Sequence, residues 1–475
     1  MTTQPPSPNS RLSASFRDPS GFLFTRQGVL YRQVNQAYQP HYDKLLNSGL
    51  YDKLVKAGLL IPHEEVGVEP AEPSLAYKVL RPERVDFISY PYEWSFSQLQ
   101  DAALATMAIQ KLALDAGMVL KDSSAYNIQF YRGRPVLIDT LSFEAYREGE
   151  PWVAYRQFCQ HFLAPLSLMA YTDVRLNQLL RIYIDGVPLD LAVRLLPGRT
   201  RFDLGLATHI HLHAVAQQRY ADKAVPVGQT AEKKPAARAG MSKLSFQGLM
   251  DSLESTTRKL KWKAAGTEWG DYYAASAGHY SSGAFEHKHQ LVGQFLERIQ
   301  PQRVWDLGAN TGEFSRLASE RSIPTVAFDI DPAAVEQNYQ ACKTNKETHM
   351  LPLVMDLTNP SPPMGFANRE RTGIQDRQRP DCILMLAVIH HMVISNNLPQ
   401  PMLAAWLASL TNHLIIEFVP KQDSQVQTLL ATRDDIFTDY TVEGFERAFG
   451  EFFETVRRSQ VEGSERMLYL MRVKK

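Results

Sequence analysis

Short apolar runs alternate with helix-length apolar patterns along two stretches of the chain. Between residues 21 and 224, runs such as GFLFT, NIQFY and PVLID have the length and composition of strands, and FSQLQDAALATMAIQKLALDAG repeats apolar residues at helical spacing. From residue 304 onward, apolar runs are separated by segments long enough for crossover helices. The first stretch therefore predicts an α+β domain, and the second predicts a doubly wound, mostly parallel α/β sheet.

Two polar segments divide these stretches. The first 20 residues are rich in proline and serine, which is typical of a disordered tail. Residues 225–241, VPVGQTAEKKPAARAGM, lack periodicity and predict a linker. We expect a tail at 1–20, the α+β domain at 21–224, the linker at 225–241 and the α/β domain at 242–475. The α/β domain would then begin with a docking helix, SFQGLMDSLESTTRKLKWK, whose basic end is solvated.

Charge and cysteine content narrow the environment of the protein. Lys plus Arg and Asp plus Glu both total 51, so no global field favours nucleic acid or a membrane surface. The three cysteines have no ligand spacing, which argues against a disulfide framework and a structural zinc site. No apolar run has the length of a signal-peptide core or a membrane span. We expect a cytoplasmic protein with no membrane contact, and nucleic acid is a less favoured partner than a small molecule, a saccharide or a protein.

The segment RVWDLGANTGEFSRLA predicts a strand, a glycine-containing turn and the start of a helix, an arrangement that binds nucleotides. Gly308 and Gly312 would let the backbone pass close to a ligand. Asp306 can order the turn and approach an amino group of the ligand, and Asn310 lies between the two glycines. These four residues are candidates for cofactor binding.

Acidic residues end the next two strands. TVAFDIDPAAVEQN ends a strand at Asp329, where a carboxylate can accept hydrogen bonds from both hydroxyls of a ribose. Asp331 is expected to cap the following helix. MLPLVMD ends at Asp356, which can accept from an adenine amino group while the backbone N–H of Leu357 meets a ring nitrogen. Because the carboxyl ends of parallel strands share one edge, these residues are expected to converge on one ligand.

Together, DLGANTG, Asp329 and Asp356 resemble the class I S-adenosylmethionine (SAM) dependent methyltransferase superfamily. A nicotinamide cofactor is disfavoured, because DLGANTG is not the GxGxxG fingerprint and an acid after the third strand suits SAM better. The resemblance implies a Rossmann-like sheet, SAM as the cofactor and transfer of its methyl group to a nucleophile by in-line displacement. Such catalysis needs mainly positioning, with a base only where the acceptor must lose a proton.

Two histidines lie at the end of the predicted fourth strand, DCILMLAVIHHM, where this fold carries acceptor-facing residues. His391 or His390 is the candidate catalytic base, and the alternative is that one or both are hydrogen-bonded packing residues. No NPPY-type motif is present, which disfavours N-methylation and favours methyl transfer to oxygen. The spacing of the histidines with Glu417 and Asp423 requires no metal ion.

Other residues around the predicted sheet are weaker candidates. Lys288 could neutralise the carboxylate of SAM, and Glu417, Lys421 and Asp423 could either shape the acceptor pocket or cap the loop after the fifth run. The segment before the first strand is rich in aromatic residues and is expected to form a lid. Its aromatics either stack on a ligand or belong to the core; they are Trp269, Tyr272, Tyr273 and Tyr280.

The first domain contains a second pattern. Asp122 stands five positions before Asn127, and PVLID ends at Asp139, a spacing that in phosphotransferases orients a hydroxyl and holds Mg²⁺ on nucleotide phosphates. The passage resembles the catalytic loop of the protein-kinase-like and aminoglycoside-phosphotransferase-like superfamily, which would imply bound Mg-ATP. It departs from that pattern, since no His or Arg precedes Asp122, no Gly follows Asp139, and Lys78 is the sole strand-lysine candidate. A degenerate kinase-like module, an active phosphotransferase and a chance α+β pattern stay open.

The whole-chain arrangement, with MDLTNPSP, LAVIHHM and IIEFVPKQDSQ in its second half, is similar to a group of bacterial proteins that includes nodulation-associated methyltransferases. That group implies methyltransferase activity and leaves the acceptor undefined. One alternative is a regulatory or scaffolding protein that binds SAM or nucleotide. Another is a bifunctional enzyme that phosphorylates and methylates one small molecule or saccharide.

Overall fold

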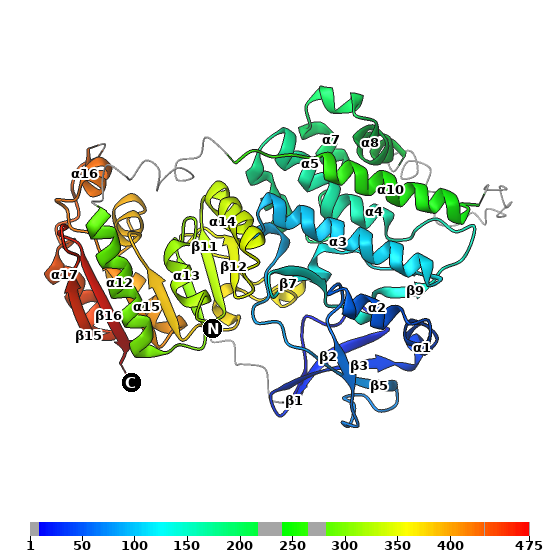
Figure 1. The fold of residues 1–475 in the computed structure, drawn as a ribbon, viewed down its shortest axis with the longest axis horizontal. Helices are drawn as coiled ribbons and strands as arrows, with labels where there is room; N and C mark the ends of the chain where they lie inside the picture. The colour runs from blue at the N-terminus through cyan, green and yellow to red at the C-terminus, as the bar shows by residue number, and fades with distance from the viewer. Residues whose placement is uncertain (1–8, 217–239, 265–281, 432, 475) are drawn as a thin grey trace. The chain divides into compact units, whose positions relative to one another are not determined.

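The computed structural model describes residues 9–216, 240–264, 282–431 and 433–474 (Figure 1). The chain forms two compact units. Of the described residues, unit 1 holds those within Met1–Val85, Ser89–Trp262 and Gly365–Arg371, and unit 2 holds those within Asp86–Ile88, Lys263–Met364 and Thr372–Lys475. In the described part of the chain, no helix is both long and apolar enough to cross a membrane.

Unit 1 begins with a five-stranded antiparallel sheet. The strand order is β1-β2-β3-β5-β4, and two helices lie between β3 and β4 in the sequence. These elements are β1 (Asn9–Arg11), β2 (Gly21–Arg26), β3 (Val29–Asn35), α1 (Gln39–Asn47), α2 (Leu50–Lys56), β4 (His63–Glu65) and β5 (Ala76–Pro82).

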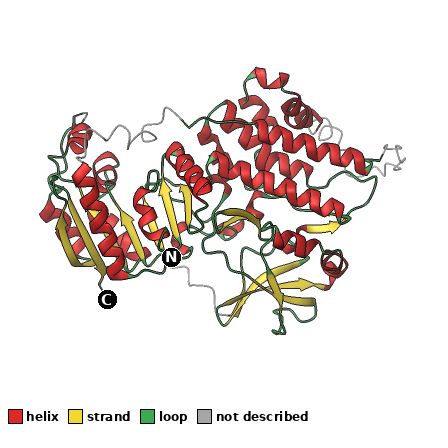
Figure 2. Ribbon diagram, viewed as in Figure 1, coloured by secondary structure: helices red, strands yellow, loops and turns green. Residues whose placement is uncertain are grey.

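The rest of unit 1 is mostly helical (Figure 2), which together with the sheet confirms the α+β prediction. Two short antiparallel pairs interrupt the helices: the hairpin of β7 with β8, and the pair of β6 with β9 that flanks it in the sequence. The elements are α3 (Phe96–Asp115), β6 (Met118–Leu120), β7 (Ile128–Tyr131), β8 (Arg134–Leu137), β9 (Phe143–Ala145), α4 (Tyr155–Phe158), α5 (Ala164–Tyr171), α6 (Leu179–Ile182), α7 (Leu189–Leu195), α8 (Leu204–Leu206) and α10 (Lys243–Lys259).

The predicted helix after the linker exists as α10, but it belongs to unit 1 and not to the second domain. It packs against α3: the Gln100 side chain donates to the carbonyls of Thr257 (2.8 Å) and Leu260 (2.9 Å) at its C-terminal end. The sequence-based boundary at residue 242 is therefore too early by the length of this helix. An apolar stripe predicts that one face of a helix is buried, but it does not predict which domain buries that face.

Residues 9–20 of the predicted disordered tail are ordered. Residues Asn9–Arg11 pair with β2, and the backbone N–H of Leu12 continues that pairing by donating to the carbonyl of Leu23 at 2.9 Å. Asp18 lies 3.4 Å from the Lys121 ammonium group. Composition alone predicted disorder, whereas strand pairing satisfies the backbone of this segment. Most of the predicted linker lies outside the described residues.

Unit 2 is built on a seven-stranded sheet in the order β12-β11-β10-β13-β14-β16-β15. The first five strands in this order are parallel, and β16 is antiparallel to both neighbours. The strands are β10 (Val304–Leu307), β11 (Thr325–Asp329), β12 (Met350–Val354), β13 (Cys382–Met385), β14 (His413–Phe418), β15 (Phe453–Gln460) and β16 (Met467–Val473). This confirms the predicted doubly wound, mostly parallel sheet of the Rossmann-like methyltransferase type.

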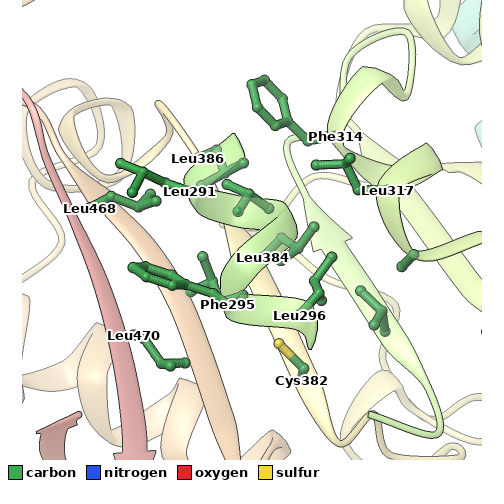
Figure 3. Close-up of a cluster of buried hydrophobic side chains, with 14 residues drawn as sticks. Leu291, Phe295, Leu296, Phe314, Leu317, Cys382, Leu384, Leu386, Leu468 and Leu470 are labelled. Atoms are coloured by element: carbon green, nitrogen blue, oxygen red, sulfur yellow. The ribbon is translucent and has the colours of Figure 1, made fainter. Parts of the chain in front are cut away.

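Helices cover both faces of this sheet. The connecting helices are α12 (Ser282–Ile299), α13 (Glu313–Ser319), α14 (Pro332–Asn345), α15 (Gln400–Leu410), α16 (Ser424–Leu430) and α17 (Val442–Gly450). Leu468 and Leu470 of β16 join a core with α12 and α13 (Figure 3), whereas the intervening Tyr469 packs against Phe445 of α17. Successive side chains of a strand point to opposite faces, so this alternation places α12 and α17 on opposite sides of the sheet.

Candidate cofactor and acceptor site

A cavity of about 800 Å³ lies at the carboxyl ends of the parallel strands of unit 2. Its volume is within the range of small-molecule sites. Of the sequence-predicted residues, those that line it are Lys288, Asp306, Gly308, Asn310, Asp329, Asp356, Leu357, His390 and His391. The predicted lid aromatics at positions 269, 272, 273 and 280 lie outside the described residues.

The turn after β10 depends on its glycines for different reasons. Gly308 has φ +85°, and a Cβ there would lie 2.2 Å from Cγ2 of Val388, so a side chain would push apart two walls of the cavity. Gly312 also has φ +85°, but it begins α13 and does not line the cavity. A Cβ on Gly312 would meet the Asn338 side chain at 2.5 Å. Gly312 therefore permits helix packing, which differs from the predicted approach to a ligand.

Asp329 is held at the end of β11 by backbone donors. Its two carboxylate oxygens accept from the N–H of Asn310 (2.7 Å) and of Asp331 (2.9 Å), and Asn310 adopts the left-handed conformation at φ +50°. A carboxylate has acceptor capacity for about four hydrogen bonds, so Asp329 keeps capacity to accept from a ribose hydroxyl. Burial raises the pKa of Asp329 to about 6, although the backbone donors oppose the shift. Asp331 caps α14 through the N–H of Ala333 at 2.8 Å, as predicted.

Asp306 is buried near the end of β10. Its Oδ2 accepts a hydrogen bond from the Ser315 hydroxyl at 2.6 Å. Burial raises the pKa of Asp306 to about 7; the Ser315 hydrogen bond lowers it, and the negative charge of Asp329 raises it further. The site therefore holds two carboxylates that a positively charged ligand would stabilise in their ionised forms.

Asp356 lies two residues beyond the end of β12. Its Oδ1 accepts from the backbone N–H of Thr358 (2.8 Å) and from the Thr358 hydroxyl (2.7 Å), which fixes the turn. Leu357 lines the cavity beside it. The two positions predicted to bind an adenine ring are therefore adjacent in the wall, on the strand next to Asp329.

The sequence predicted that the two histidines end the fourth strand, but the structure places them beyond it. β13 stops at Met385, Ala387 takes φ +56°, and His391 begins the short π-helical turn η12 (His391–Ser395). An alanine in the left-handed region costs energy, and such strain is concentrated at functional sites. Nothing in the sequence signals this turn, because alanine is not a turn former.

His390 and His391 differ in their surroundings. His390 is 2% exposed, and among the described residues no hydrogen-bond partner is found for its Nδ1. Burial, the neighbouring His391 and the charges of Arg466 and Lys288 hold the pKa of His390 well below its usual value. His391 is half-buried, and burial lowers its pKa as well. The rings lie 4.1 Å apart between centroids.

Buried charges form the floor behind these histidines. Lys288 Nζ lies 2.6 Å from Oε2 of Glu417, so its charge has a buried partner inside the protein, and its contact with a SAM carboxylate stays a prediction. Arg466 binds Asp423 through Nε at 2.6 Å and lies 3.7 Å from Oε1 of Glu417. Lys288 and Arg466 line the cavity, whereas Glu417 and Asp423 do not. Sequence reasoning missed Arg466, whose partners come from distant parts of the chain.

Lys421 and Asp423 serve the loop after β14. Lys421 pairs with the carboxylate of Asp435 at 2.7 Å, and Asp423 accepts from the N–H of Gln425 at the start of α16. The sequence predicted that these residues either shape the acceptor pocket or cap the loop, and the structure supports capping of the loop.

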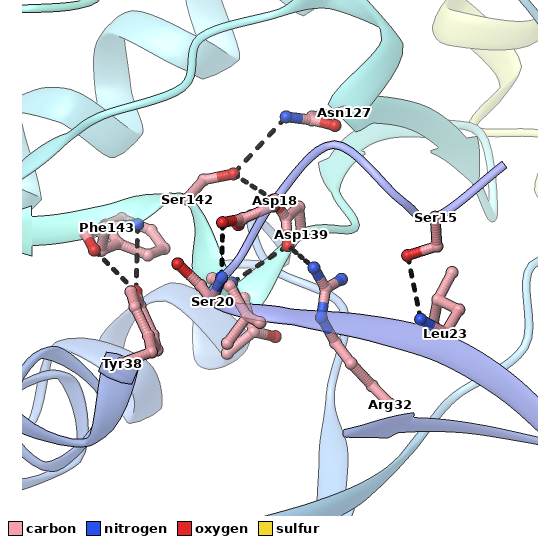
Figure 4. A network of polar contacts seen from close by, with 12 residues as sticks. Ser15, Asp18, Ser20, Leu23, Arg32, Tyr38, Asn127, Asp139, Ser142 and Phe143 are labelled. Carbon is pink, nitrogen blue, oxygen red and sulfur yellow. Dashed lines mark hydrogen bonds and ion pairs between the residues drawn. The ribbon is translucent and has the colours of Figure 1, made fainter. Parts of the chain in front are cut away.

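In unit 1, the three residues of the phosphotransferase-like pattern meet in one polar network. The predicted hairpin between Asn127 and Asp139 is present as β7 and β8. Asp139 forms an ion pair with Arg32 of β3 and accepts from the Ser142 hydroxyl at 2.7 Å, and Ser142 in turn lies 3.5 Å from the Asn127 amide (Figure 4). Asp122 accepts from the N–H of Ser124 at 2.9 Å, and burial raises its pKa. A Mg²⁺ ion would have to share Asp139 with the Arg32 guanidinium, and the kinase-like assignment stays a prediction.

Solved structures with related features include three methyltransferase-containing proteins, each covering less than half of this chain. The magnesium protoporphyrin IX methyltransferase ChlM of Synechocystis PCC 6803, solved with bound SAH, is 16% identical and covers 43% of this chain and 94% of its own, with a TM-score of 0.31. The N-methyltransferase NodS of Bradyrhizobium japonicum WM9 is 12% identical over 41% of this chain and 99% of its own, with a TM-score of 0.30. The bifunctional kinase-methyltransferase WbdD is 16% identical over 42% of this chain and 41% of its own, with a TM-score of 0.27. Scores this low carry no argument, and the fold assignment rests on the sheet order and the cavity.

One relative matches almost the entire chain, and no family model matches. The nodulation protein NoeA of Rhizobium meliloti (strain 1021) is 35% identical over 469 residues, which cover 97% of this chain and 95% of that protein. The chain therefore belongs to the family of the nodulation protein NoeA, and its second unit has the fold of a class I SAM-dependent methyltransferase.

Proposed function

We propose that this protein is an enzyme that binds SAM in the cavity of unit 2 and methylates an oxygen atom of a small molecule, a saccharide or a protein. The observation that carries the proposal is the convergence of Asp306, Asp329 and Asp356, from three neighbouring strand ends, on one cavity. The cysteines Cys159, Cys342 and Cys382 are all buried and unpaired, which fits a reducing compartment such as the cytoplasm.

The residues present fit SAM by the chemistry of their donors and acceptors. Asp329 would accept hydrogen bonds from the ribose hydroxyls, Asp356 and the N–H of Leu357 would hold the adenine ring, and Asp306 would stabilise the positively charged methionine end. When bound, SAM supplies an activated methyl group, which passes from sulfur to the acceptor oxygen and leaves S-adenosylhomocysteine and a methylated product.

His390 is the residue that we assign to the acceptor hydroxyl. Its Nδ1 has no partner among the described residues although it is buried beside the cavity, and a buried polar atom without a partner is costly. The low pKa keeps the imidazole neutral at pH 7, so its lone pair can accept the hydroxyl proton as the C–O bond forms. The assignment to oxygen rests on this group together with the lack of an NPPY-type motif in the sequence.

Calorimetric titration of SAM into the wild type and Asp329→Ala tests the cofactor site. We expect the substitution to weaken binding by about 10- to 100-fold, because hydrogen bonds to a charged group contribute roughly 1.5–3 kcal/mol. Asp331→Ala is the matched control, since that carboxylate caps α14 and does not line the cavity; it should lose about 1 kcal/mol of stability and keep its affinity.

No binding of SAM to the wild type would contradict the proposal and would leave the regulatory or scaffolding alternative as the leading one. Turnover separates an enzyme from a SAM sensor, because an enzyme must release S-adenosylhomocysteine in the presence of some acceptor. No observation in unit 1 favours the bifunctional alternative over these two.

A further inference from the structure

Neutral hydrogen-bonding side chains dominate one part of the wall of the cavity in unit 2. From position 390 onward, the lining residues that can form hydrogen bonds are His390, His391, Ser395, Asn396, Gln425 and Arg466, and we call this set the acceptor wall. These residues come from η12 and the positions beside it, from α16, which packs against η12, and from the position before β16. Burial lowers the pKa of both histidines, so Arg466 alone in this set is charged at pH 7.

The charge of Arg466 is compensated inside the protein. Arg466 is 3% exposed, its Nε and Nη2 lie 2.6 Å and 3.1 Å from the Asp423 carboxylate, and its Nη1 lies 3.7 Å from Glu417. Lys288 is the other buried cation of this network, so two positive charges face two negative ones. Asp423 also accepts from the backbone N–H of Gln425 at 2.9 Å, which holds the start of α16 beside the cavity. An anionic acceptor would therefore meet no uncompensated cation in the acceptor wall.

Ser395 contributes a buried hydroxyl to the acceptor wall. Among the described residues no hydrogen-bond partner is found for its Oγ, although the residue lines the cavity. The next residue, Asn396, fixes the end of η12, because its side chain donates to the carbonyl of His391 at 2.9 Å. A buried polar atom without a partner costs free energy, so this hydroxyl indicates a ligand group that pairs with it. Nδ1 of His390 is a second such atom in the same wall.

We propose that the methyl acceptor is a neutral saccharide, and that Ser395 and Gln425 bind hydroxyl groups near the one that His390 deprotonates. This inference rests on the proposed function, because it requires SAM in the same cavity. The reaction is unchanged: the bond between sulfur and the methyl carbon of SAM breaks, a bond from that carbon to the sugar oxygen forms, and the hydroxyl proton passes to His390.

The acceptor wall matches sugar hydroxyls by its hydrogen-bonding capacity. Hydroxyl and amide side chains both donate and accept, as sugar hydroxyls do, and three such side chains line one cavity. A carboxylate or phosphate only accepts, and it would add a charge to a network in which the charges already cancel. An aromatic acceptor would cover Ser395 and the amides without pairing with them, which costs free energy for each unpaired group. A neutral acceptor with several hydroxyl groups is therefore favoured over both.

A glycan array probed with the full-length protein, loaded with S-adenosylhomocysteine, tests the acceptor class. We expect retention on neutral glycans and not on carboxylated or sulfated ones, and transfer of tritium from methyl-labelled SAM to the retained glycans. In steady-state kinetics with a retained glycan, Ser395→Ala with Gln425→Ala should raise the KM for the glycan by about 10- to 100-fold, through the loss of two hydrogen bonds. The kcat and the affinity for SAM should change little, because these side chains bind the acceptor and not the cofactor.

Gln427→Ala provides a matched control. Gln427 is exposed on the same helix, α16, and does not line the cavity, so this variant should keep the KM of the wild type. Comparable melting temperatures would show that the variants are folded. The inference is overturned if the wild type binds SAM but neither retains nor methylates a neutral glycan, if methyl transfer is confined to acidic glycans or to a peptide array, or if the double variant keeps its KM. Calorimetry with SAM distinguishes the two failures, because a wild type that binds no SAM contradicts the proposed function itself.

Discussion

Replacing Glu417 by leucine is expected to lower the free energy of unfolding of unit 2 by about 3–5 kcal/mol, the cost of removing one partner from a buried ion pair. Glu417 is completely buried in β14, between Lys288 at 2.6 Å and Arg466 at 3.7 Å. Without the carboxylate, Lys288 would lose its ion-pair partner, and the charge of Asp306 would offset less of the cost of its burial. Its pKa, already lowered by burial, would fall further until the ammonium group gave up its proton.

A double substitution separates the ion pair from the packing. Lys288→Met together with Glu417→Leu removes both charges, so this variant should be more stable than Glu417→Leu alone. Arg466 keeps its bidentate contact with Asp423 in both variants. Hydrogen exchange of the paired strands β14 and β16 assigns the effect to unit 2, because these amides open with its core. A change below about 1 kcal/mol for the single variant would mean that water or a side-chain rearrangement compensates Lys288.

The strands and acids of the cofactor site could be predicted because each depends on local sequence. The apolar run before DLGANTG coincides with β10, and Asp329 ends β11 as its spacing predicts. In a parallel sheet the carboxyl ends of adjacent strands lie at the same edge, so predicting the ends of these two strands also predicted that their acids lie close together. The antiparallel pair β15 and β16 was not predicted, and its place at the sheet edge leaves the predicted site intact.

The floor of the cavity could not be predicted, because its contacts join residues far apart in the chain. Lys288 and Glu417 are separated by 129 positions, and no periodicity relates a helix surface to a particular strand. The one available signal was a single glutamate inside the apolar run HLIIEF, since a buried strand tolerates a carboxylate only with a partner. Local sequence also does not show which distant element a helix packs against, which explains why α10 was correctly predicted as a helix but assigned to the wrong unit.

The affinity for SAM is expected to rise on the order of 100-fold between pH 5.5 and pH 8. In the protein without ligand, burial raises the pKa of Asp306 to about 7 and that of Asp329 to about 6, so both bind protons in the acidic part of this range. Ribose hydroxyls and a cationic ligand favour the ionised carboxylates. Binding therefore expels protons, and the affinity increases as the pH rises through 6 and 7 and levels off above both values.

The sign of the effect on stability is opposite to its sign on binding. A carboxyl group whose pKa is raised by folding contributes stability at low pH, and this contribution is lost as the pH rises through the folded pKa. The two carboxyl groups therefore stabilise the ligand-free protein least at the pH where SAM binds best. Calorimetry in two buffers of different ionisation enthalpy measures the proton release directly. Asp329→Asn should remove the part of the pH dependence centred near 6 and move the part due to Asp306 to lower pH, because the charge of Asp329 raises the pKa of Asp306. An affinity that is flat across this range would mean that both carboxylates are already ionised before SAM arrives, and that the cavity is better hydrated than its buried acids indicate.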